Sequence, residues 1–244
     1  MGGQENRRLN QQECAIAVMA KRPEPGKVKT RLCPPLTLLQ AADLYEAFFL
    51  DTVSLVSGID HADVFIAFDP ASARTFFSSV LSAPVYCIPQ GPGDLGDRLS
   101  RISHQVFFQG YRKLIILASD TPHLPQDVLR MAFARLDDDD VVLGPCDDGG
   151  YYLIGLRFPA PTLFAGIPWS TSLVLERTIG RAEEAGMTWK VLPPCYDIDT
   201  WEDAERLTRD LLVDTQGTMN GCLRTKEALA GMAPDRHAMQ PKYR

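Results

Sequence analysis

The chain has 244 residues, 45% of them hydrophobic and 23% charged, and its 31 acidic side chains outnumber its 25 Lys and Arg side chains. This balance is ordinary for a globular protein, and no apolar run reaches the roughly 18–20 residues of a membrane-spanning helix, so we expect no membrane insertion. The net charge of −6 argues against nucleic acid as a partner, because phosphate backbones attract broad basic surfaces.

Apolar runs alternate with helical patterns along the chain, which predicts an α/β fold with a mostly parallel sheet covered on both faces. The apolar runs predict strands at residues 14–20, 63–68, 84–89, 113–119, 140–145, 151–156 and 188–193. Helical spacing predicts helices at residues 38–56, 71–81, from the Gly-rich segment 90–99 to about 109, 126–136, 171–185 and 201–212. Only five residues separate the fifth and sixth strands, too few for a helical crossover, so one of the two should run antiparallel.

No linker divides the chain, and we expect a single domain over residues 14–214. Residues 1–13 are polar, lack the apolar core of a signal peptide, and are predicted to form a disordered lead-in. Residues 215–244 are predicted to form a C-terminal helix and tail. The six cysteines are dispersed without a C-x-x-C pair, which indicates reduced thiols in a cytosolic protein rather than a zinc site. The oligomeric state is open.

A basic segment follows the first predicted strand, with Lys21, Lys27, Lys29 and Arg31 placed around Gly26. In open α/β sheets, ligands bind beyond the carboxyl ends of the strands. Cationic side chains and backbone N–H groups at such a position can hold a polyphosphate. The alternative is a solvated basic loop.

A Gly-rich turn follows the third predicted strand and contains Gln90, Gly91 and Gly93. Its glycines permit close approach of the backbone to a flat ligand. The alternative is a structural turn in which Asp94 caps the next helix.

Acidic residues stand at three further strand ends. Asp120 follows the fourth predicted strand, where it can hold Mg²⁺ or Mn²⁺, since hard cations take oxygen ligands; an Asx-turn is the alternative. Asp197 and Asp199 alternate, so if extended they point to opposite faces, and one of them can reach the same cation. Asp147 and Asp148 are predicted to form an acceptor-site wall or a metal neighbour, or simply a hairpin turn.

Six ordered motifs resemble those of the nucleotide-diphospho-sugar transferase superfamily, which has the GT-A fold. The chain is most similar to a poorly characterised bacterial family that is provisionally assigned as glycosyltransferases. The motifs lie at residues 21–32 (K-x-P-x-P-G-x-V-K-T-R-L), 93–99 (G-D-L-G-x-R-L), 119–124 (S-D-x-P-x-L), 148–156 (D-G-G-Y-Y-L-I-G-L), 167–171 (I-P-W-S-T) and 197–200 (D-x-D-T). The first and last also resemble those of phospholactate guanylyltransferases, which share a K-S/T-R-L loop. The chain departs from this pattern in lacking the paired glycines of the usual nucleotidyltransferase loop and the usual glycosyltransferase D-x-D.

The resemblance implies a three-layer α/β/α, Rossmann-like fold, with Mg²⁺ or Mn²⁺ as cofactor and with a nucleotide or nucleotide-sugar and a small-molecule acceptor as partners. It also implies that the basic loop holds phosphates and that the Gly-rich turn at Gln90, Gly91 and Gly93 meets the base. Asp120 and Asp199 would hold the cation.

The leading interpretation is a metal-dependent transferase that uses a nucleotide-sugar donor. Asp120, Asp148 and Lys29 are the predicted catalytic residues, and the predicted acceptor side contains Asp147, Tyr151 and Trp169. Two alternatives are open. One is a nucleotidyltransferase of guanylyl or cytidylyl type that releases pyrophosphate, and the other is a non-catalytic nucleotide-binding protein.

Overall fold

The computed structural model describes residues 13–81, 84–214 and 221–232. The predicted lead-in, apart from Glu13, and the predicted tail beyond residue 232 lie outside the described residues. Among the described helices, none combines the length and the apolar character that crossing a bilayer requires.

In the described part of the chain, seven strands form one sheet in the order β3-β2-β1-β4-β6-β5-β7. The strands are β1 Cys14–Lys21, β2 Ala62–Asp69, β3 Tyr86–Pro89, β4 Lys113–Ala118, β5 Val141–Pro145, β6 Tyr151–Leu156 and β7 Trp189–Val191. β6 pairs antiparallel with both β4 and β5, whereas the other pairs are parallel. The predicted antiparallel strand is therefore confirmed, and it is β6.

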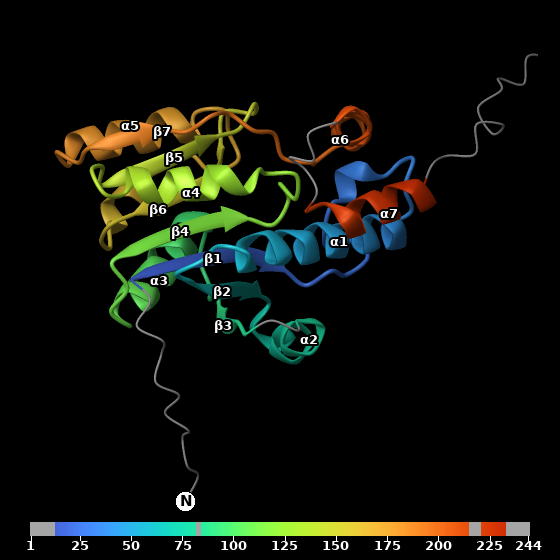
Figure 1. Ribbon diagram of the computed structural model, residues 1–244, viewed down its shortest axis with the longest axis horizontal. Helices are drawn as coiled ribbons and strands as arrows, with labels where there is room; N and C mark the ends of the chain where they lie inside the picture. The colour runs from blue at the N-terminus through green and yellow to red at the C-terminus, as the bar shows by residue number, and fades with distance from the viewer. Residues whose placement is uncertain (1–12, 82–83, 215–220, 233–244) are drawn as a thin grey trace, which may run out of the picture.

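Helices cover both faces of the sheet, which confirms the predicted three-layer α/β/α architecture (Figure 1). The helices are α1 Leu38–Ser57, α2 Arg74–Val80, α3 Leu95–Phe107, α4 Gln126–Arg135, α5 Val174–Glu184, α6 Trp201–Val213 and α7 Leu223–Gly231. One face packs against α1, α2 and α4, and the other packs against α3 and α5.

The alternation of side chains along β1 shows how the core is divided. Ile16 and Val18 face the layer that contains α1, while Ala15 and Ala17 face the layer that contains α3. All four are fully buried, as expected for a central parallel strand. A third apolar cluster lies beyond the sheet, where α6, α7 and the loop after β1 pack against the first half of α1. Figure 1 shows α7 lying alongside α1.

Three helices begin with reciprocal hydrogen bonds between a capping residue and the residue three positions later. These capping boxes pair Thr37 with Gln40 in α1, Asp94 with Asp97 in α3, and Thr200 with Asp203 in α6. The capping role considered for Asp94 is thus confirmed.

Two predicted elements are shorter than expected for local reasons. The helix predicted from residue 171 starts at Val174, because the Thr171 hydroxyl donates to the Pro168 carbonyl and accepts from the Leu173 N–H in a preceding turn. The strand predicted to residue 193 ends at Val191, ahead of two prolines that offer no N–H to a sheet.

The order of the strands places a topological switch point between β1 and β4. After β1 the chain proceeds outward to β2 and β3, then returns to β4 on the other side of β1. The loops that leave the carboxyl ends of β1 and β4 therefore diverge, and a crevice opens between them, which is the usual ligand position in such sheets.

Candidate functional site

A cleft of about 620 Å³ lies at this switch point. It is lined by the loop after β1, the turn before α3, the segment after β4 and the end of the segment before α6. The predicted site residues that line it are Lys21, Lys27, Lys29, Arg31, Gln90, Gly93, Asp120 and Asp199. The structure thus brings the basic loop, the Gly-rich turn and the two predicted cation ligands to one place.

Lys29 lies at the centre of the charged groups in this cleft. Its side chain is only 7% exposed, and its Nζ is 2.9 Å from Asp120 Oδ2 and 2.5 Å from Asp199 Oδ1. Arg31 Nη1 approaches the other oxygen of Asp199 at 3.3 Å. Burial alone would lower the pKa of Lys29, but the attraction of the two carboxylates outweighs it and holds that pKa above its usual value. Lys29 is therefore a charged ammonium that lies between two acids.

The backbone of Lys29 is also unusual, with φ 47° and ψ 37° in the left-handed region, where non-glycine residues are uncommon. This conformation costs free energy that surrounding contacts must offset, and the two ion pairs of the side chain supply such contacts. The sequence contains no glycine at this position that would have signalled the turn.

Three carboxylates gather beside Lys29. Oxygens of Asp120, Asp197 and Asp199 lie within 4.8 Å of one another. Asp197 and Asp199 were expected to point to opposite faces if their segment is extended, but the segment forms no strand, and oxygens of both lie near Asp120. Instead, the buried Ile198 between them donates its N–H to the Asp120 carbonyl at 3.1 Å, which holds both acids next to Asp120.

Two of these carboxylates have unused acceptor capacity. Asp120 Oδ1 is buried, and no described residue gives it a hydrogen bond. Within the described ranges, Asp197 likewise has no hydrogen-bond or ion-pair partner, and burial together with the charges of Asp120 and Asp199 raises its pKa to about 6. Hard divalent cations prefer oxygen ligands that carry negative charge. These carboxylates therefore have the chemistry that the predicted Mg²⁺ or Mn²⁺ requires.

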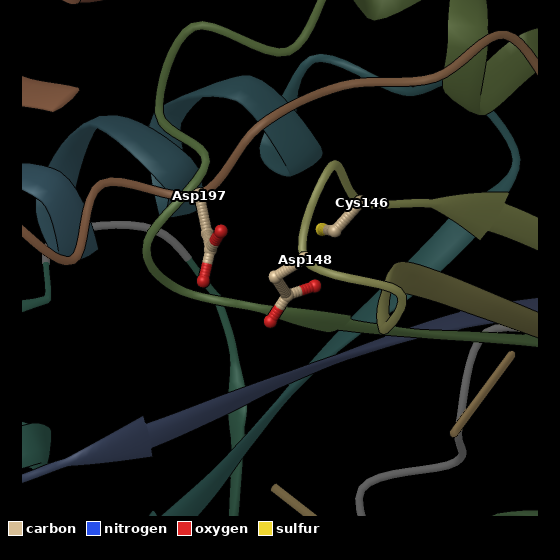
Figure 2. A group of neighbouring side chains, drawn as sticks. All are labelled: Cys146, Asp148 and Asp197. Carbon is tan, nitrogen blue, oxygen red and sulfur yellow. The ribbon is translucent and has the colours of Figure 1, made fainter. Parts of the chain in front are cut away.

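A second group adjoins the first through Asp197. Cys146 Sγ and an oxygen of Asp148 lie within 4.8 Å of the Asp197 carboxylate and of each other. Figure 2 shows the two acids turned toward the same space, Asp148 from the loop after β5 and Asp197 from the segment before α6. Burial, followed by the nearby Asp197 and Asp148, raises the pKa of Cys146, so this sulfur remains a neutral thiol beside the acids.

The Gly-rich turn is organised by a residue that sequence reasoning missed, Arg98. The Gln90 side chain is buried and donates to the carbonyls of Ala20 and Ala67, at 3.2 and 2.8 Å. Its oxygen accepts from Arg98 Nη1 at 3.2 Å, and Arg98 Nε donates to the Gly93 carbonyl at 3.0 Å. Arg98 lines the cleft, so the cationic group next to the turn belongs to α3. Its position within the G-D-L-G-x-R-L motif was the available signal.

The remaining predicted residues do not line the cleft. Asp147 forms an exposed ion pair with Arg206 at 2.8 Å. Asp148 accepts from the Gly150 N–H in an Asx-turn. Tyr151 packs into the core layer that contains α5.

Three others support the cleft from behind its wall. Trp169 packs so close to Gly96 of α3 that no side chain would fit at that glycine, and its neighbour Ser170 lines the cleft. Gly26 and Gly91 adopt positive φ angles of 78° and 79° in the two turns that carry lining residues. These glycines act on the cleft through backbone shape.

A second cavity of about 700 Å³ lies at the opposite edge of the sheet, around the start of β4 and the end of β6. No residue predicted to act in the site lines it. Its lysine and one of its arginines pair with neighbouring acids, Lys113 with Asp137 and Arg112 with Glu13. The candidate site is therefore the cleft at the switch point, although it is the smaller of the two.

Comparison with known proteins gives a family for this arrangement. Residues 52–171 match the model of a bacterial family described as an uncharacterized protein conserved in bacteria (DUF2064). A comparison with curated proteins found no match.

Among solved structures, the chain is similar to a protein from Desulfovibrio desulfuricans G20, provisionally described as a nucleotide-diphospho-sugar transferase. The TM-score is 0.81 at 32% identity, over 91% of this chain and 98% of the other.

Two further structures share the fold at much lower identity. One is 4-diphosphocytidyl-2C-methyl-D-erythritol synthase from Anaerococcus prevotii DSM 20548, with a TM-score of 0.54 and 10% identity over 82% of this chain and 97% of that one. The other is the bifunctional IspDF from Campylobacter jejuni, with a TM-score of 0.52 and 9% identity over 80% of this chain and 54% of that one. With the cleft at the expected place in the sheet and the 32% identical relative matched almost end to end, the chain is a transferase that belongs to the nucleotide-diphospho-sugar transferase family.

Proposed function

We propose that this transferase binds a nucleotide-sugar together with Mg²⁺ or Mn²⁺ in the cleft at the switch point and transfers the sugar to a small-molecule acceptor. One observation carries the proposal. Lys29, Asp120 and Asp199 come from three segments far apart in the sequence and meet inside one cleft, with charges suited to a phosphate-bound cation. Membership in a transferase family favours an enzyme over the non-catalytic nucleotide-binding alternative.

The basic loop is assigned to the donor phosphates. Lys21 and Lys27 line the cleft, and within the described part of the chain neither side chain has an ion-pair partner, so both are available to a diphosphate. Arg31 stands 71% exposed at the rim, where it can exchange its long contact with Asp199 for a phosphate oxygen. The base is assigned to the turn at Gln90, Gly91 and Gly93. There, the amide of Gln90 is occupied, and Arg98 Nε and Nη1 already bond Gly93, Gln90 and Asp69, so Arg98 Nη2 is the group that can donate to a ligand.

The carboxylates are assigned to the cation. Asp120, Asp197 and Asp199 would hold it through their oxygens, with Asp120 Oδ1 already free of other partners among the described residues. A bound Mg²⁺ or Mn²⁺ would supply Lewis-acid stabilisation of the negative charge that develops on the departing diphosphate. Lys29 adds a positive charge at the same point.

In the transfer itself, the bond between sugar C1 and the phosphate oxygen breaks, and a bond forms between C1 and an acceptor hydroxyl oxygen. The hydroxyl proton goes to a carboxylate, and the nucleoside diphosphate leaves. We assign Asp148 to this proton because it lies beside Asp197 on the loop after β5 (Figure 2). Asp147, Tyr151 and Trp169 are assigned to the acceptor side as supports of that loop and of the wall at Ser170.

The Asp120→Asn variant tests this assignment, since it keeps the shape of the side chain but removes a cation ligand. We expect nucleoside diphosphate release from a panel of nucleotide-sugars with Mn²⁺ to fall at least about 100-fold, as for loss of a group that stabilises the leaving charge. Asp43→Asn is the matched control, because this acid is exposed on α1 and does not line the cleft. Equal, metal-dependent turnover by Asp120→Asn and the wild type would refute the proposal.

Nucleotidyl transfer is the second candidate. The number of cationic groups at the cleft favours it, since Lys21, Lys27, Lys29, Arg31 and Arg98 suit the higher charge of a triphosphate. In that reaction an oxygen of the phosphorylated acceptor bonds to the α-phosphorus, the bond from the α-phosphorus to the oxygen that bridges to the β-phosphorus breaks, and pyrophosphate leaves. Incubation with nucleoside triphosphates and candidate phosphorylated acceptors separates the two. Pyrophosphate release supports this candidate, and nucleoside diphosphate release from a nucleotide-sugar supports the first.

A further inference from the structure

We propose that Lys29 acts as a built-in stand-in for the divalent cation: its ammonium holds Asp120 and Asp199 in the ligand-free protein and moves to the phosphates when the nucleotide brings the metal ion. The inference rests on the proposed function and adds a rule to it. Metal alone binds weakly, and metal and nucleotide each strengthen the binding of the other.

The ammonium of Lys29 occupies the place where a cation would contact Asp120 and Asp199. Lys29 Nζ bridges Asp120 Oδ2 and Asp199 Oδ1 at 2.9 and 2.5 Å. These are two of the three carboxylates whose oxygens form the candidate cation site. A metal ion that used the same two oxygens would meet the ammonium, and two positive charges would compete for one pair of acids.

The ion pairs of Lys29 leave other carboxylate oxygens of the cluster without a partner among the described residues. If the ammonium replaced the metal permanently, all three carboxylates should be satisfied by protein groups. Instead, Asp120 Oδ1 is buried without a hydrogen-bond partner among the described residues, and no described residue pairs with Asp197. One ammonium and the exposed Arg31 do not balance Asp120, Asp197, Asp199 and the adjacent Asp148. The site therefore retains capacity for a divalent ion.

Phosphates held by the neighbouring lysines would offer the Lys29 ammonium new partners in the same cleft. Lys21 and Lys27 line the same cleft, so phosphates that they attract arrive within the cleft that Lys29 faces. Phosphate oxygens then replace the carboxylates as partners of the ammonium, and Asp120 and Asp199 become available to the ion that the phosphates carry. Since coupling between two ligands is reciprocal, metal must raise nucleotide affinity by the factor by which nucleotide raises metal affinity.

Binding of Mn²⁺ without nucleotide tests the inference and needs no catalytic activity. We would titrate wild type, Lys29→Gln and Lys27→Gln with Mn²⁺ and follow the free ion by electron paramagnetic resonance. We expect Lys29→Gln to bind the ion about tenfold more tightly than the wild type, because the competing ammonium is gone. Lys27→Gln removes the same charge from the same cleft but no ion pair with a described residue, and we expect a change below about twofold.

The inference is overturned if, without nucleotide, Lys29→Gln binds Mn²⁺ no more tightly than Lys27→Gln does. The wild type supplies a second readout if Lys29→Gln does not fold. When a nucleoside diphosphate is added, the Mn²⁺ affinity of the protein must rise at least about tenfold. This affinity is calculated after subtracting the Mn²⁺ that is bound to free nucleotide. Equal affinity with and without nucleotide also overturns it. Failure of the wild type to bind nucleotide under any metal condition would instead refute the proposed function.

Discussion

Asp197 and His123 show two ways in which this molecule buries an ionisable side chain near its cleft. Burial, followed by the charges of the neighbouring Asp120 and Asp199, raises the pKa of Asp197 to about 6. His123 is only 3% exposed and contacts Cys195 Sγ through Nε2 at 3.3 Å, while no described residue bonds its Nδ1. Burial, opposed by the attraction of Asp210, lowers the pKa of His123 to about 4.

The buried histidine predicts a pH dependence of stability. The folded protein keeps His123 neutral down to about pH 4, whereas the unfolded chain takes up a proton near pH 6.5. At His123 the unfolded state therefore binds more protons between these values, and the contribution of His123 to the free energy of unfolding falls by about 3 kcal/mol as the pH drops through this window. The raised pKa of Asp197 acts in the opposite direction below about pH 6, so the effect of His123 is measured as a difference from a variant that lacks it. Urea unfolding from pH 7.5 to 4.5 measures this.

In His123→Phe, which keeps a ring against Tyr196, the fall in the free energy of unfolding should be smaller than in the wild type. His104→Gln changes an exposed histidine of α3 and should leave the wild-type slope in place. A His123→Phe protein that loses as much stability as the wild type over the same pH range would show that this histidine does not set the dependence.

At the scale of elements, the turn before α3 links backbone shape to the cleft. Gly93 has φ 100°, and a Cβ at this position would overlap the Asp97 side chain, which completes the capping box of α3. The Gly93 carbonyl also accepts from Arg98, the cationic residue of α3 at the cleft. One small residue thus allows both the helix cap and the placement of a binding group.

Gly93→Ala should therefore cost more than the unfavourable φ alone. Gly110 is the matched control, because its φ is 98° and an added Cβ there would meet no atom within 4 Å. We expect chemical unfolding to show Gly93→Ala to be at least about 1 kcal/mol less stable than Gly110→Ala, through loss of the cap. Nucleotide binding should weaken only in Gly93→Ala. Equal stabilities of the two variants would mean that the turn tolerates the extra atom.

The elements that sequence reasoning predicted well are those whose signals are local. Thr37 and Thr200 mark the starts of two helices, because each forms a capping box with the residue three positions later. The short gap between the fifth and sixth strands requires that one of them be antiparallel. The grouping of the basic loop with Asp120 followed from the rule that strand ends meet at one edge, whereas the choice of Asp199 came from the family resemblance.

The parts that were missed depend on contacts between distant segments. Arg98 is one turn into an amphipathic helix, and nothing in its neighbours shows that Gln90 will hold it toward the cleft. The alternation of Asp197 and Asp199 predicts divergence only for an extended segment, and it left open which of the two reaches the cation. Their convergence depends on Ile198 docking against the Asp120 carbonyl, a contact across 78 residues that no local pattern contains.

For the molecule as a whole, the cleft depends on contacts between the loop after β1, near the start of the chain, and the C-terminal part of the fold. The loop after β1 carries the cations that we assign to the donor phosphates, and its apolar residues Val28 and Leu32 pack in the same cluster as Leu207 of α6 and Leu229 of α7. The loop that carries Lys29 is therefore held in part by helices that contribute no lining residue. Its placement should be sensitive to how the C-terminal helices dock.

The docking of α7 depends on one buried acid. Asp51 of α1 is fully buried, and its carboxylate accepts from the backbone N–H groups of Arg224 and Thr225, at 3.3 and 2.7 Å. A carboxylate at the first turn of a helix satisfies donors that would otherwise have no partner and complements the helix dipole. Asp51→Ala removes this and should lower the free energy of unfolding by about 1.5–3 kcal/mol, the range for hydrogen bonds to a charged group.

Because α7 packs in the cluster that holds the loop of Lys29, Asp51→Ala should also weaken nucleotide binding in Mn²⁺, although Asp51 lies outside the cleft. Calorimetric titration of nucleotide and hydrogen exchange over residues 22–32 would measure the two effects together. Asp43→Ala is the matched control, since it removes an exposed acid from the same helix. If Asp51→Ala is destabilised yet binds nucleotide as tightly as Asp43→Ala, the loop that carries Lys29 is held by α1 and α6 without help from α7.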